Sequence, residues 1–382
     1  MQSRLPMVGT NIFTVMSALA AESGAVNLGQ GFPDFDPDPV LIDHVAQAMR
    51  SGHNQYAPLN GVPMLRERLS EKIRQLYGHA YCADTEIMIT AGATQAVFTA
   101  LMALTQPGDE VLVIEPAFDS YVPGIVLAGG HPVSVPMTRD YRVDWDRIRS
   151  AVTAKTRLIL VNSPHNPSGL ILSDADMRAL ESIVMDTGLW VISDEVYEHM
   201  VFDGRCHQSA ARYPALASRT VVVSSFGKTF HVTGWKMGFV AAPTRLMTEY
   251  RKVHQFNVFV ANSAVQVGLA HYTADPQRYL ALPDFYQRKR DFFRQGLLVT
   301  PLRLYPCEGT FFQMVDYSAV PSLSGKRERE ACEWLTREVG VAAIPLSSFY
   351  QVPTENCTIR FCFAKRDDTL QTGLDRLQQR LV

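Results

Sequence analysis

Lys228 is the residue whose surroundings most clearly suggest chemistry. It follows the β-branched run Thr220–Val223 and lies within Ser224-Ser225-Phe226-Gly227-Lys228-Thr229. A lysine placed after a buried strand, among small residues, can form a Schiff base with an aldehyde cofactor. Ser225 precedes it and can bind a phosphate oxygen, while Lys236 follows and can lower the pKa of Lys228 or neutralise a phosphate dianion. A solvated loop lysine is the ordinary alternative, but the two cations together favour cofactor binding.

Asp194 is a second candidate, because it ends the apolar run Trp190-Val191-Ile192-Ser193-Asp194. A buried carboxylate is costly unless a cation lies beside it. A protonated pyridine nitrogen is such a cation, and Tyr197, close behind in sequence, can donate to the phenolate oxygen of the same ring. The structural alternatives are a helix N-cap for Asp194 and a core side chain for Tyr197.

Three other turns after apolar runs carry residues that suit a phosphorylated ring. Asn166 lies between two prolines, which would hold its amide rigidly. Ala93 and Thr94 open a helical stretch, where small residues and the helix N-terminus favour an anion. Phe118 follows another strand and can stack on a ring. Each has an ordinary alternative: a turn residue, a common strand–helix connection and a core phenylalanine.

Arg360 interrupts the apolar run Ile359-Arg360-Phe361-Cys362-Phe363. A buried arginine needs an anionic partner. A substrate carboxylate held by two parallel hydrogen bonds is the functional candidate, and a structural ion pair is the alternative.

The elements that must position these residues read as an α/β pattern. Short apolar runs alternate with helical stretches such as Thr94–Leu104 and Ser173–Thr187, which predicts a mostly parallel sheet with helices on both faces. Ligands of such sheets bind beyond the carboxyl ends of the strands, where the candidate residues lie. The predicted strands are Ile87–Thr90, Val111–Glu115, Arg157–Asn162, Trp190–Asp194, Thr220–Ser224 and Gly238–Ala242.

The pattern changes to α+β after Pro276. The predicted helices there are Arg278–Leu298 and Glu328–Val339, and the predicted strands are Gly309–Val315 and Thr358–Phe363. The first 40 residues have no sheet-like core and should pack on this second unit as an arm. We therefore predict a large domain at residues 41–285 and a smaller α+β domain formed by residues 1–40 and 286–382.

Composition narrows the classes of function. The 382 residues carry a formal net charge of -2 without a basic run, which disfavours nucleic acid as a partner. No apolar stretch reaches the roughly 18 residues of a membrane span. The six cysteines form no C-x-x-C pair and indicate reduced, mostly buried thiols of a cytoplasmic protein. Ile12–Ala21 resembles a secretory signal, but the Leu28–Pro33 segment follows too closely and favours a short amphipathic helix.

Taken together and in this order, the candidate residues resemble the class I and II aminotransferases of fold type I over nearly the whole chain. Asn27–Phe35, the stretch from Lys228 to Lys236 and Ala343–Leu346 are most similar to the branch of methionine aminotransferases and kynurenine–glutamine aminotransferases. The resemblance implies pyridoxal 5'-phosphate (PLP) as the cofactor. It also implies a homodimer with shared active sites.

The resemblance further implies a role for each candidate. Lys228 would hold the cofactor, Asp194 would pair with its pyridine nitrogen, and Phe118 would stack on the ring. Tyr197 and Asn166 would bind the phenolate oxygen. The implied phosphate ligands are Ala93, Thr94, Ser225 and Lys236, with Tyr56 of the partner subunit, and the implied ligands of the substrate carboxylate are Arg360, Asn166 and the backbone at Gly31. Many relatives have arginine in place of Lys236, and kynurenine-type relatives often have an aromatic residue in place of Thr94.

The implied reaction is a ping-pong transamination in which the freed Lys228 amine moves a proton from the substrate Cα. No motif supplies an additional arginine for a distal carboxylate, so we expect an uncharged donor, methionine above all. The expected pocket side chains are Phe13, Phe32, Phe118, Phe259 and Phe349, with Tyr56 of the partner subunit. A cysteine-S-conjugate β-lyase and a kynurenine or glutamine aminotransferase remain alternatives. A cofactor-binding regulatory module is disfavoured, because the chain leaves no length for a DNA-binding domain.

Overall fold

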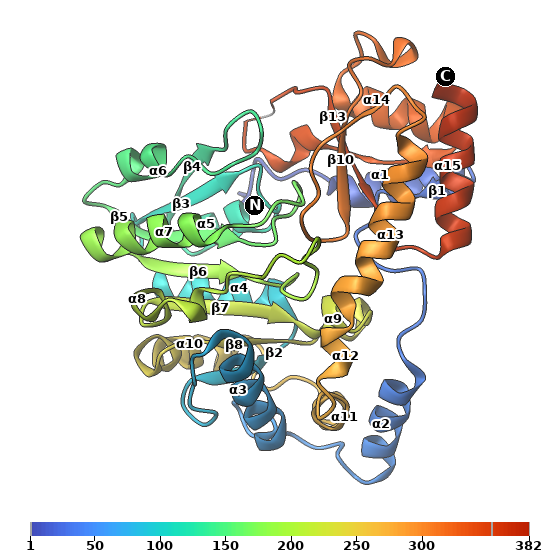
Figure 1. Cartoon of the computed structure of the whole chain (residues 1–382). Coiled ribbons are helices and arrows are strands. Elements are labelled where there is room, and N and C mark those ends of the chain that lie inside the picture. Colours follow the sequence, from blue (N-terminus) through green and yellow to red (C-terminus); the bar gives the residue numbers. More distant parts are fainter. Residues whose placement is uncertain (1, 353, 382) are drawn as a thin grey trace.

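A computed structural model describes residues 2–352 and 354–381 and contains a large and a small sheet (Figure 1). The large sheet has seven strands in the order β2 (Ile87–Thr90), β8 (Gly238–Ala241), β7 (Thr220–Ser225), β6 (Trp190–Asp194), β5 (Thr156–Asn162), β3 (Glu110–Glu115) and β4 (His131–Pro136). Strands β7, β6, β5, β3 and β4 pair in parallel. Strand β8 runs antiparallel to both of its neighbours, β2 and β7. The predicted mostly parallel sheet is therefore confirmed.

Helices cover both faces of the large sheet. Alternate strand residues point to opposite faces, so Val111 and Val113 pack in one buried cluster with α4, α5 and α10, while Leu112 packs in another with α6, α7 and α8. The helices of the chain are α1 (Ile12–Glu22), α2 (Pro39–Arg50), α3 (Pro63–Tyr77), α4 (Ala93–Leu104), α5 (Tyr121–Leu127), α6 (Trp145–Ala151), α7 (Asp174–Thr187), α8 (Pro214–Ala217), α9 (Phe226–Thr229), α10 (Thr244–Asn257), α11 (Ser263–Tyr272), α12 (Gln277–Leu280), α13 (Leu282–Leu297), α14 (Glu328–Trp334) and α15 (Asp367–Leu381).

The small sheet is antiparallel and has the order β12 (Ile344–Pro345), β13 (Thr358–Cys362), β10 (Phe312–Asp316) and β9 (Arg303–Leu304). The N-terminal arm lies beside it: β1 (Val26–Asn27) pairs in parallel with β11 (Val341–Ala342), and α1 contacts α14. Met16, Leu19 and Ala20 of α1 are buried, as an amphipathic helix requires. The arm thus packs on the C-terminal unit, as the sequence predicts (Figure 1).

Several elements differ from the sequence expectation for local reasons. Strand β4 was not expected, since its His and Pro residues interrupt the apolar pattern; it lies at the sheet edge, where proline is tolerated. The expected helix Arg278–Leu298 is divided into α12 and α13, and Pro283 stands in the first turn of α13. Strand β10 begins at Phe312, because Thr310 has a φ of 64° and turns the chain toward Met200.

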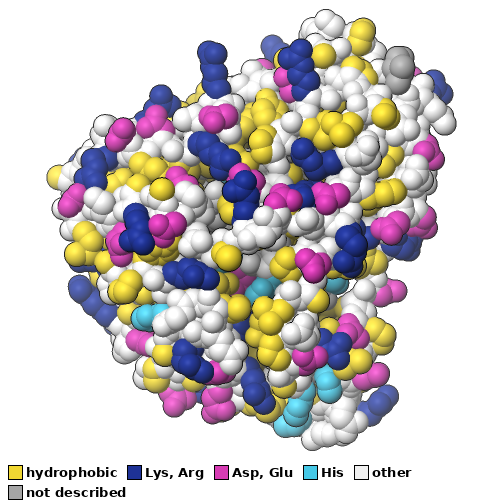
Figure 2. Space-filling model, viewed as in Figure 1, with side chains coloured by type: hydrophobic (Ala, Val, Ile, Leu, Met, Phe, Trp, Pro, Cys, Tyr) yellow, Lys and Arg dark blue, Asp and Glu magenta, His cyan; other side chains and the backbone are white. Residues whose placement is uncertain are grey.

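The surface charges and the thiols are distributed as in an ordinary folded protein. Basic and acidic side chains are interspersed on the face in Figure 2. All six cysteines are free; Cys307, Cys332 and Cys362 are buried, whereas Cys82 and Cys206 are exposed. Within the described residues, no helix is both long and apolar enough to cross a membrane.

Candidate active site

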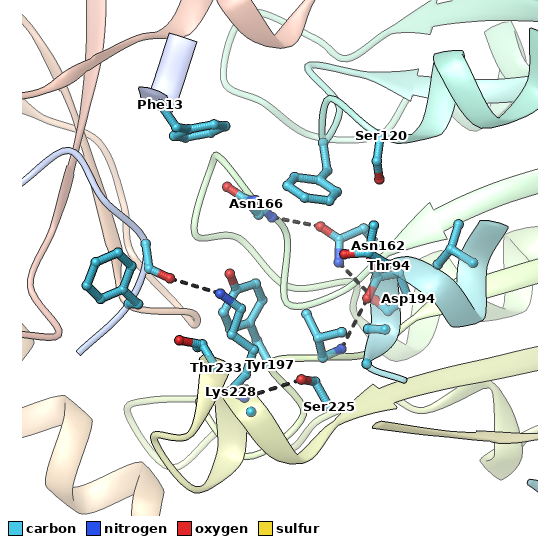
Figure 3. Close-up of a pocket in the computed structure, with 18 of the residues that line it drawn as sticks. Phe13, Thr94, Ser120, Asn162, Asn166, Asp194, Tyr197, Ser225, Lys228 and Thr233 are labelled. Carbon is cyan, nitrogen blue, oxygen red and sulfur yellow. Dashed lines mark hydrogen bonds between the residues drawn. The ribbon is translucent and has the colours of Figure 1, made fainter. Parts of the chain in front are cut away.

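A cavity of about 260 Å³ lies where the carboxyl ends of β5, β6 and β7 approach the small sheet (Figure 3). It brings together almost all the residues predicted from sequence. Those that line it are Gly31, Ala93, Thr94, Phe118, Asn166, Asp194, Tyr197, Ser225, Lys228, Lys236 and Arg360. Tyr56 is the predicted site residue that does not line it.

Lys228 projects into this cavity from α9, directly after β7 (Figure 3). The Ser225 hydroxyl caps α9 by accepting a hydrogen bond from the Lys228 backbone N–H at 3.3 Å. Lys228 Nζ donates to the Gly31 carbonyl at 2.8 Å. Burial lowers the pKa of Lys228 to about 8, and the positive charges of Arg360 and Lys236 act in the same direction. About a tenth of this amine is therefore neutral at pH 7, and a nucleophile or a base acts in this neutral form.

Asp194 ends β6 with its carboxylate toward the cavity. The Tyr121 hydroxyl donates to Asp194 Oδ2 at 2.6 Å, and the Val196 N–H donates to Oδ1 at 3.3 Å. Burial raises the pKa of Asp194 to about 6, although the Tyr121 hydrogen bond opposes this effect. No described residue forms an ion pair with Asp194 within 4.0 Å. The carboxylate thus fits a cationic ring nitrogen, which would supply the missing counter-charge.

The opposite end of the cavity suits an anion. No side chain caps the N-terminus of α4, and the preceding Gly92 has a φ of 81°. A Cβ at Gly92 would lie 3.5 Å from Lys236, so the two segments are packed closely there. Helix N–H groups, the Ser225 hydroxyl and the Lys236 ammonium surround this end, a combination that binds phosphate well. A phosphorylated pyridine aldehyde therefore fits the cavity at all three of its groups.

Arg360 of β13 provides a buried cation on the other wall. Its Nη1 donates to Asn166 Oδ1 at 2.6 Å and its Nη2 donates to the Gly29 carbonyl at 3.2 Å, whereas its Nε has no partner. The Phe312 ring lies 3.8 Å from the guanidinium carbon. Burial lowers the pKa of Arg360 to about 10. Across residues 2–352 and 354–381 no carboxylate pairs with Arg360 within 4.0 Å, so the alternative of a structural ion pair is wrong.

Sequence reasoning missed three residues that hold the site. Tyr121 was seen only as part of a segment, yet its hydroxyl orients Asp194. Asn162 donates to the Asp194 carbonyl at 2.8 Å and accepts from the Asn166 N–H at 2.8 Å, which joins two site residues (Figure 3). Asn162 ends β5 and Tyr121 lies soon after β3, so both positions were available as signals. Phe312, which packs on Arg360, carried no such signal, because it reads as ordinary core.

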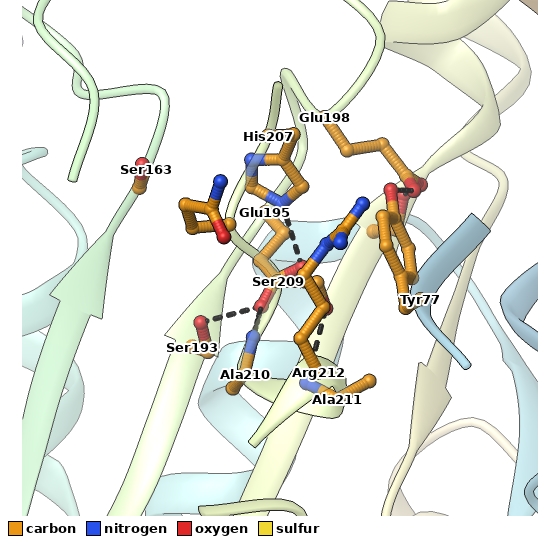
Figure 4. A network of polar contacts seen from close by, with 12 residues as sticks. Tyr77, Ser163, Ser193, Glu195, Glu198, His207, Ser209, Ala210, Ala211 and Arg212 are labelled. Carbon is orange, nitrogen blue, oxygen red and sulfur yellow. Dashed lines mark hydrogen bonds and ion pairs between the residues drawn. The ribbon is translucent and has the colours of Figure 1, made fainter. Parts of the chain in front are cut away.

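Two buried acids flank the turn that carries Asp194 and Tyr197 (Figure 4). Glu195 accepts from the Ala210 N–H at 2.9 Å and lies 2.8 Å from His207 Nε2. Glu198 accepts from Lys72 Nζ at 2.7 Å and from the Tyr77 hydroxyl at 2.5 Å. Burial alone would raise the pKa of Glu198, but the Lys72 charge and the hydrogen bonds from Lys72 and Ser224 together keep that pKa below its ordinary value. The turn is therefore fixed from behind by charged hydrogen bonds.

The aromatic wall differs in part from the prediction. Phe13, Phe32 and Phe118 line the cavity, as expected. Phe349 does not line it; it is buried behind Arg360, with its ring 5.0 Å from the guanidinium carbon. Phe259 does not line it either, because it meets the 80 % exposed ring of Tyr56 at the surface, 5.2 Å between ring centroids. The prediction that both rings line this pocket is wrong for the chain by itself.

Known proteins share this sequence and this fold. Residues 23–377 match the family model described as aminotransferase class I and II. A methionine aminotransferase of Escherichia coli is 47% identical over 380 residues, which cover 99% of this chain and 98% of that protein. The rat kynurenine–oxoglutarate transaminase 1 is 33% identical and covers 98% of this chain and 97% of that protein.

Solved structures agree with these matches. The crystal structure of an E. coli protein with an identified methionine aminotransferase function has a TM-score of 0.96 at 47% identity and covers 99% of each chain. A single mutant of the Thermus thermophilus aspartate aminotransferase has a TM-score of 0.90 at 28% identity, over 99% of each chain. The predicted fold class is thereby confirmed. Family model, relatives and fold agree over nearly the full length, and the chain is an aminotransferase of the class I and II family.

Proposed function

We propose that this aminotransferase uses PLP to transfer the amino group of an uncharged L-amino acid, methionine above all, to a 2-oxo acid. The observation that carries the proposal is a single cavity in which Lys228, Asp194 and Arg360 face one another between aromatic walls. The 47% identity to a methionine aminotransferase supports the choice of donor.

The residues present fit PLP at each of its groups. Lys228 Nζ would hold the aldehyde carbon, and Asp194 would pair with the pyridine nitrogen. Tyr197 and Asn166 would bind the phenolate oxygen, and Phe118 would stack on the ring. Ala93, Thr94, Ser225 and Lys236 would hold the phosphate. When bound, PLP supplies an electron sink conjugated with the substrate Cα.

The chain's own residues then bind the substrate and move its proton. Arg360 and the Gly31 backbone hold the carboxylate, and Asn166 fixes Arg360 through the 2.6 Å hydrogen bond. This grip would fix the orientation of the substrate Cα–H bond relative to Lys228 and the cofactor. Lys228 Nζ, neutral in part because burial lowers its pKa to about 8, takes the proton from the substrate Cα and so acts as the base of the reaction. Asp194 stays ionised above its pKa of about 6 and keeps a negative charge beside the ring nitrogen.

The side-chain pocket favours flat or polarizable donors. Phe13, Phe32 and Phe118 form its apolar surface, and a thioether makes favourable contacts with aromatic rings. The cations that line the cavity within the described chain are Lys228, Lys236 and Arg360, and each already has a proposed role. A second carboxylate would lose its hydration without a partner. Aspartate should therefore be a poor donor, and glutamine, kynurenine and the aromatic amino acids are secondary candidates.

We also propose a homodimer in which Tyr56 reaches the phosphate of the partner's site. Tyr56 is 80 % exposed and meets Phe259 edge to face, which leaves an aromatic pair on the surface of the single chain. An exposed aromatic pair is typical of a surface that a partner covers.

The test is kcat/KM across a donor panel with one fixed 2-oxo acid acceptor. Methionine should exceed aspartate by at least about 100-fold, the scale of an uncompensated buried charge. Release of pyruvate from a cysteine S-conjugate, measured in parallel, separates the β-lyase alternative. Aspartate equal to methionine would overturn the proposed donor class.

A further inference from the structure

The segment Gly29–Phe32 separates the active-site cavity from a second cavity. Gln30 and Phe32 line both of them. The second cavity has a volume of about 350 Å³ and is also lined by Lys365 and Asp34. This short segment is therefore a wall with a different set of side chains on each side.

Three cationic side chains hold four successive carbonyls of this segment. Arg360 Nη2 donates to the Gly29 carbonyl at 3.2 Å, and Lys228 Nζ donates to the Gly31 carbonyl at 2.8 Å. Lys365 Nζ donates to the two others, at 3.3 Å to Gln30 and at 2.8 Å to Phe32. The carbonyls on either side of Gly31 thus point to Lys365, whereas the Gly31 carbonyl points into the active site.

Lys365 is an unusual lysine, because it is only 3 % exposed and no described carboxylate pairs with it within 4.0 Å. Its partners are the two carbonyls and the Phe32 ring, whose centroid lies 5.0 Å from Nζ. Burying an ammonium group without a counter-charge is costly. Because burying Lys365 costs free energy, its contacts with this one backbone segment indicate a specific role there and not a general contribution to stability.

The ends of the segment are fixed independently of Lys365. Asn27 Oδ1 accepts from the N–H groups of Gly29 and Gln30 at 3.1 and 3.2 Å. Asp34 accepts from the Arg366 N–H at 2.5 Å and from the Thr369 hydroxyl at 2.7 Å. Between these ends, Lys365 holds the Gln30–Gly31 and Phe32–Pro33 peptide groups through their carbonyls.

We propose that Lys365 is a positioning residue for the substrate carboxylate. By holding the Gln30 and Phe32 carbonyls on its own side, it prevents them from turning toward Arg360 and competing with the substrate for that guanidinium. Because the Gln30 carbonyl and the Gly31 N–H belong to one peptide group and point in opposite directions, Lys365 also keeps the Gly31 N–H turned toward the cavity. Lys228 and Arg360 face the cavity and exchange partners during the reaction, whereas Lys365 lies behind the wall and keeps its bonds throughout. The inference rests on the proposed assignment of Arg360 and Gly31 as the carboxylate site.

The test compares two analogues of methionine, one that lacks the α-amino group and one that lacks the carboxylate. The deaminated analogue keeps the carboxylate, and the decarboxylated analogue keeps the amine. Calorimetric titration of the holoenzyme gives both dissociation constants. In Lys365→Met, the constant for the carboxylate ligand should rise about tenfold, as expected for lost hydrogen bonds to a charged group, while that for the amine stays within about twofold. The cofactor absorption spectrum and the melting temperature should remain near those of the parent enzyme.

Lys289→Met is the matched control. Lys289 Nζ donates to the Lys365 carbonyl and to Asp367, both at 2.8 Å, but it has no hydrogen bond to Gly29–Phe32. This variant should bind both ligands like the parent. Lys365→Gln, which keeps one polar donor group, repeats the test if the methionine variant does not fold, with the same selective loss expected. Equal weakening of both ligands, or weakening of neither, overturns the proposal.

Arg360→Met tests the proposed carboxylate site separately from the positioning role of Lys365. It should weaken the carboxylate ligand selectively and more strongly than Lys365→Met does. If it weakens neither ligand or both equally, the carboxylate site itself is wrong, whatever Lys365→Met shows. If it is selective and Lys365→Met is not, only the positioning role fails.

Discussion

At the scale of single residues, the site is built from charges that lack ordinary partners. Asp194, Lys228 and Arg360 are largely buried and, among the residues described, none belongs to an ion pair. Burial raises the pKa of Asp194 and lowers the pKa values of Lys228 and Arg360, which in each case favours the neutral form of the side chain. Such groups reduce the stability of the free chain and are satisfied by bound ligands, which is a common property of active sites.

Removing the ammonium group of Lys228 should stabilise the cofactor-free enzyme. The pKa of Lys228 is about 8 in the fold, against 10.5 ordinarily. Between these two pH values, Lys228 is protonated in the unfolded chain but mostly neutral in the fold. The stability of the parent therefore falls as the pH decreases from about 10.5 to 8, and it stays low below pH 8. Lys228→Met should therefore raise the free energy of unfolding by about 2 kcal/mol at pH 7, with the gain gone near pH 10.5. Melting temperatures of both proteins across this pH range give the answer, and a pH-independent difference would contradict it.

The counter-charge role of Asp194 predicts a large kinetic effect. Asp194→Ala should lower kcat at least about 100-fold, because the negative charge beside the ring nitrogen is lost. Tyr121→Phe removes only one hydrogen bond to that carboxylate and should cost about tenfold. Steady-state kinetics with methionine measure both. A near-normal rate in Asp194→Ala would return this residue to a structural role.

The sequence indicated which residues meet at the site, because the chemically distinctive residues follow the predicted strands and the ends of those strands lie together at one edge of the sheet. It did not indicate which way each side chain points. Phe349 was expected in the pocket but packs behind Arg360, since its place depends on how the segment after β12 folds back on β13. The hydroxyl of Tyr121 was missed for the same reason: its contact with Asp194 joins residues 73 positions apart.

At the scale of elements, the large sheet was predictable because its strands are apolar and β-branched throughout. For six of its strands, the predicted ends lie within one residue of the observed ends, whereas the edge strand β4 was not predicted. Strands β1, β11 and β12 have only two residues each, too few for any periodicity to reveal. The predicted boundaries of the large domain, at residues 41 and 285, fall inside α2 and α13. We propose that these two helices join the large and small units.

The contact of α3 with the turn after β6 gives a test at this scale. Lys72 of α3 and Glu198 of that turn form a pair at 2.7 Å with side chains 10% and 3% exposed. Glu198→Gln leaves the lysine charge buried and should destabilise the enzyme by about 3 kcal/mol, while Lys72→Met/Glu198→Gln should recover much of the loss. Denaturant unfolding measures both.

The exposed pair Arg178–Asp174 is the control, with side chains 67% and 57% exposed. Arg178→Met should change stability by less than about 0.5 kcal/mol. A double variant no more stable than Glu198→Gln would mean that the cost lies in lost packing, not in the unpaired charge.

At the scale of the whole molecule, the proposed dimer makes a complementation experiment possible. Lys228→Ala should be inactive, and Tyr56→Ala should bind the cofactor about tenfold more weakly. In a mixed dimer, the site that keeps its own Lys228 receives an intact Tyr56 of the partner subunit. Mixing the two variants should therefore restore activity under conditions where neither alone is active. Activity no higher than the sum of the separate variants would refute the shared site.

Lys228 stands at the centre of the proposed chemistry, so its attachment to the cofactor is the most direct measurement. The purified holoenzyme should be yellow, and reduction with borohydride should fix the cofactor permanently to the chain. Peptide mapping by mass spectrometry should then place the label on Lys228 alone. Label on Lys236, Lys72 or any other lysine, or no covalent label at all, would contradict the proposed site.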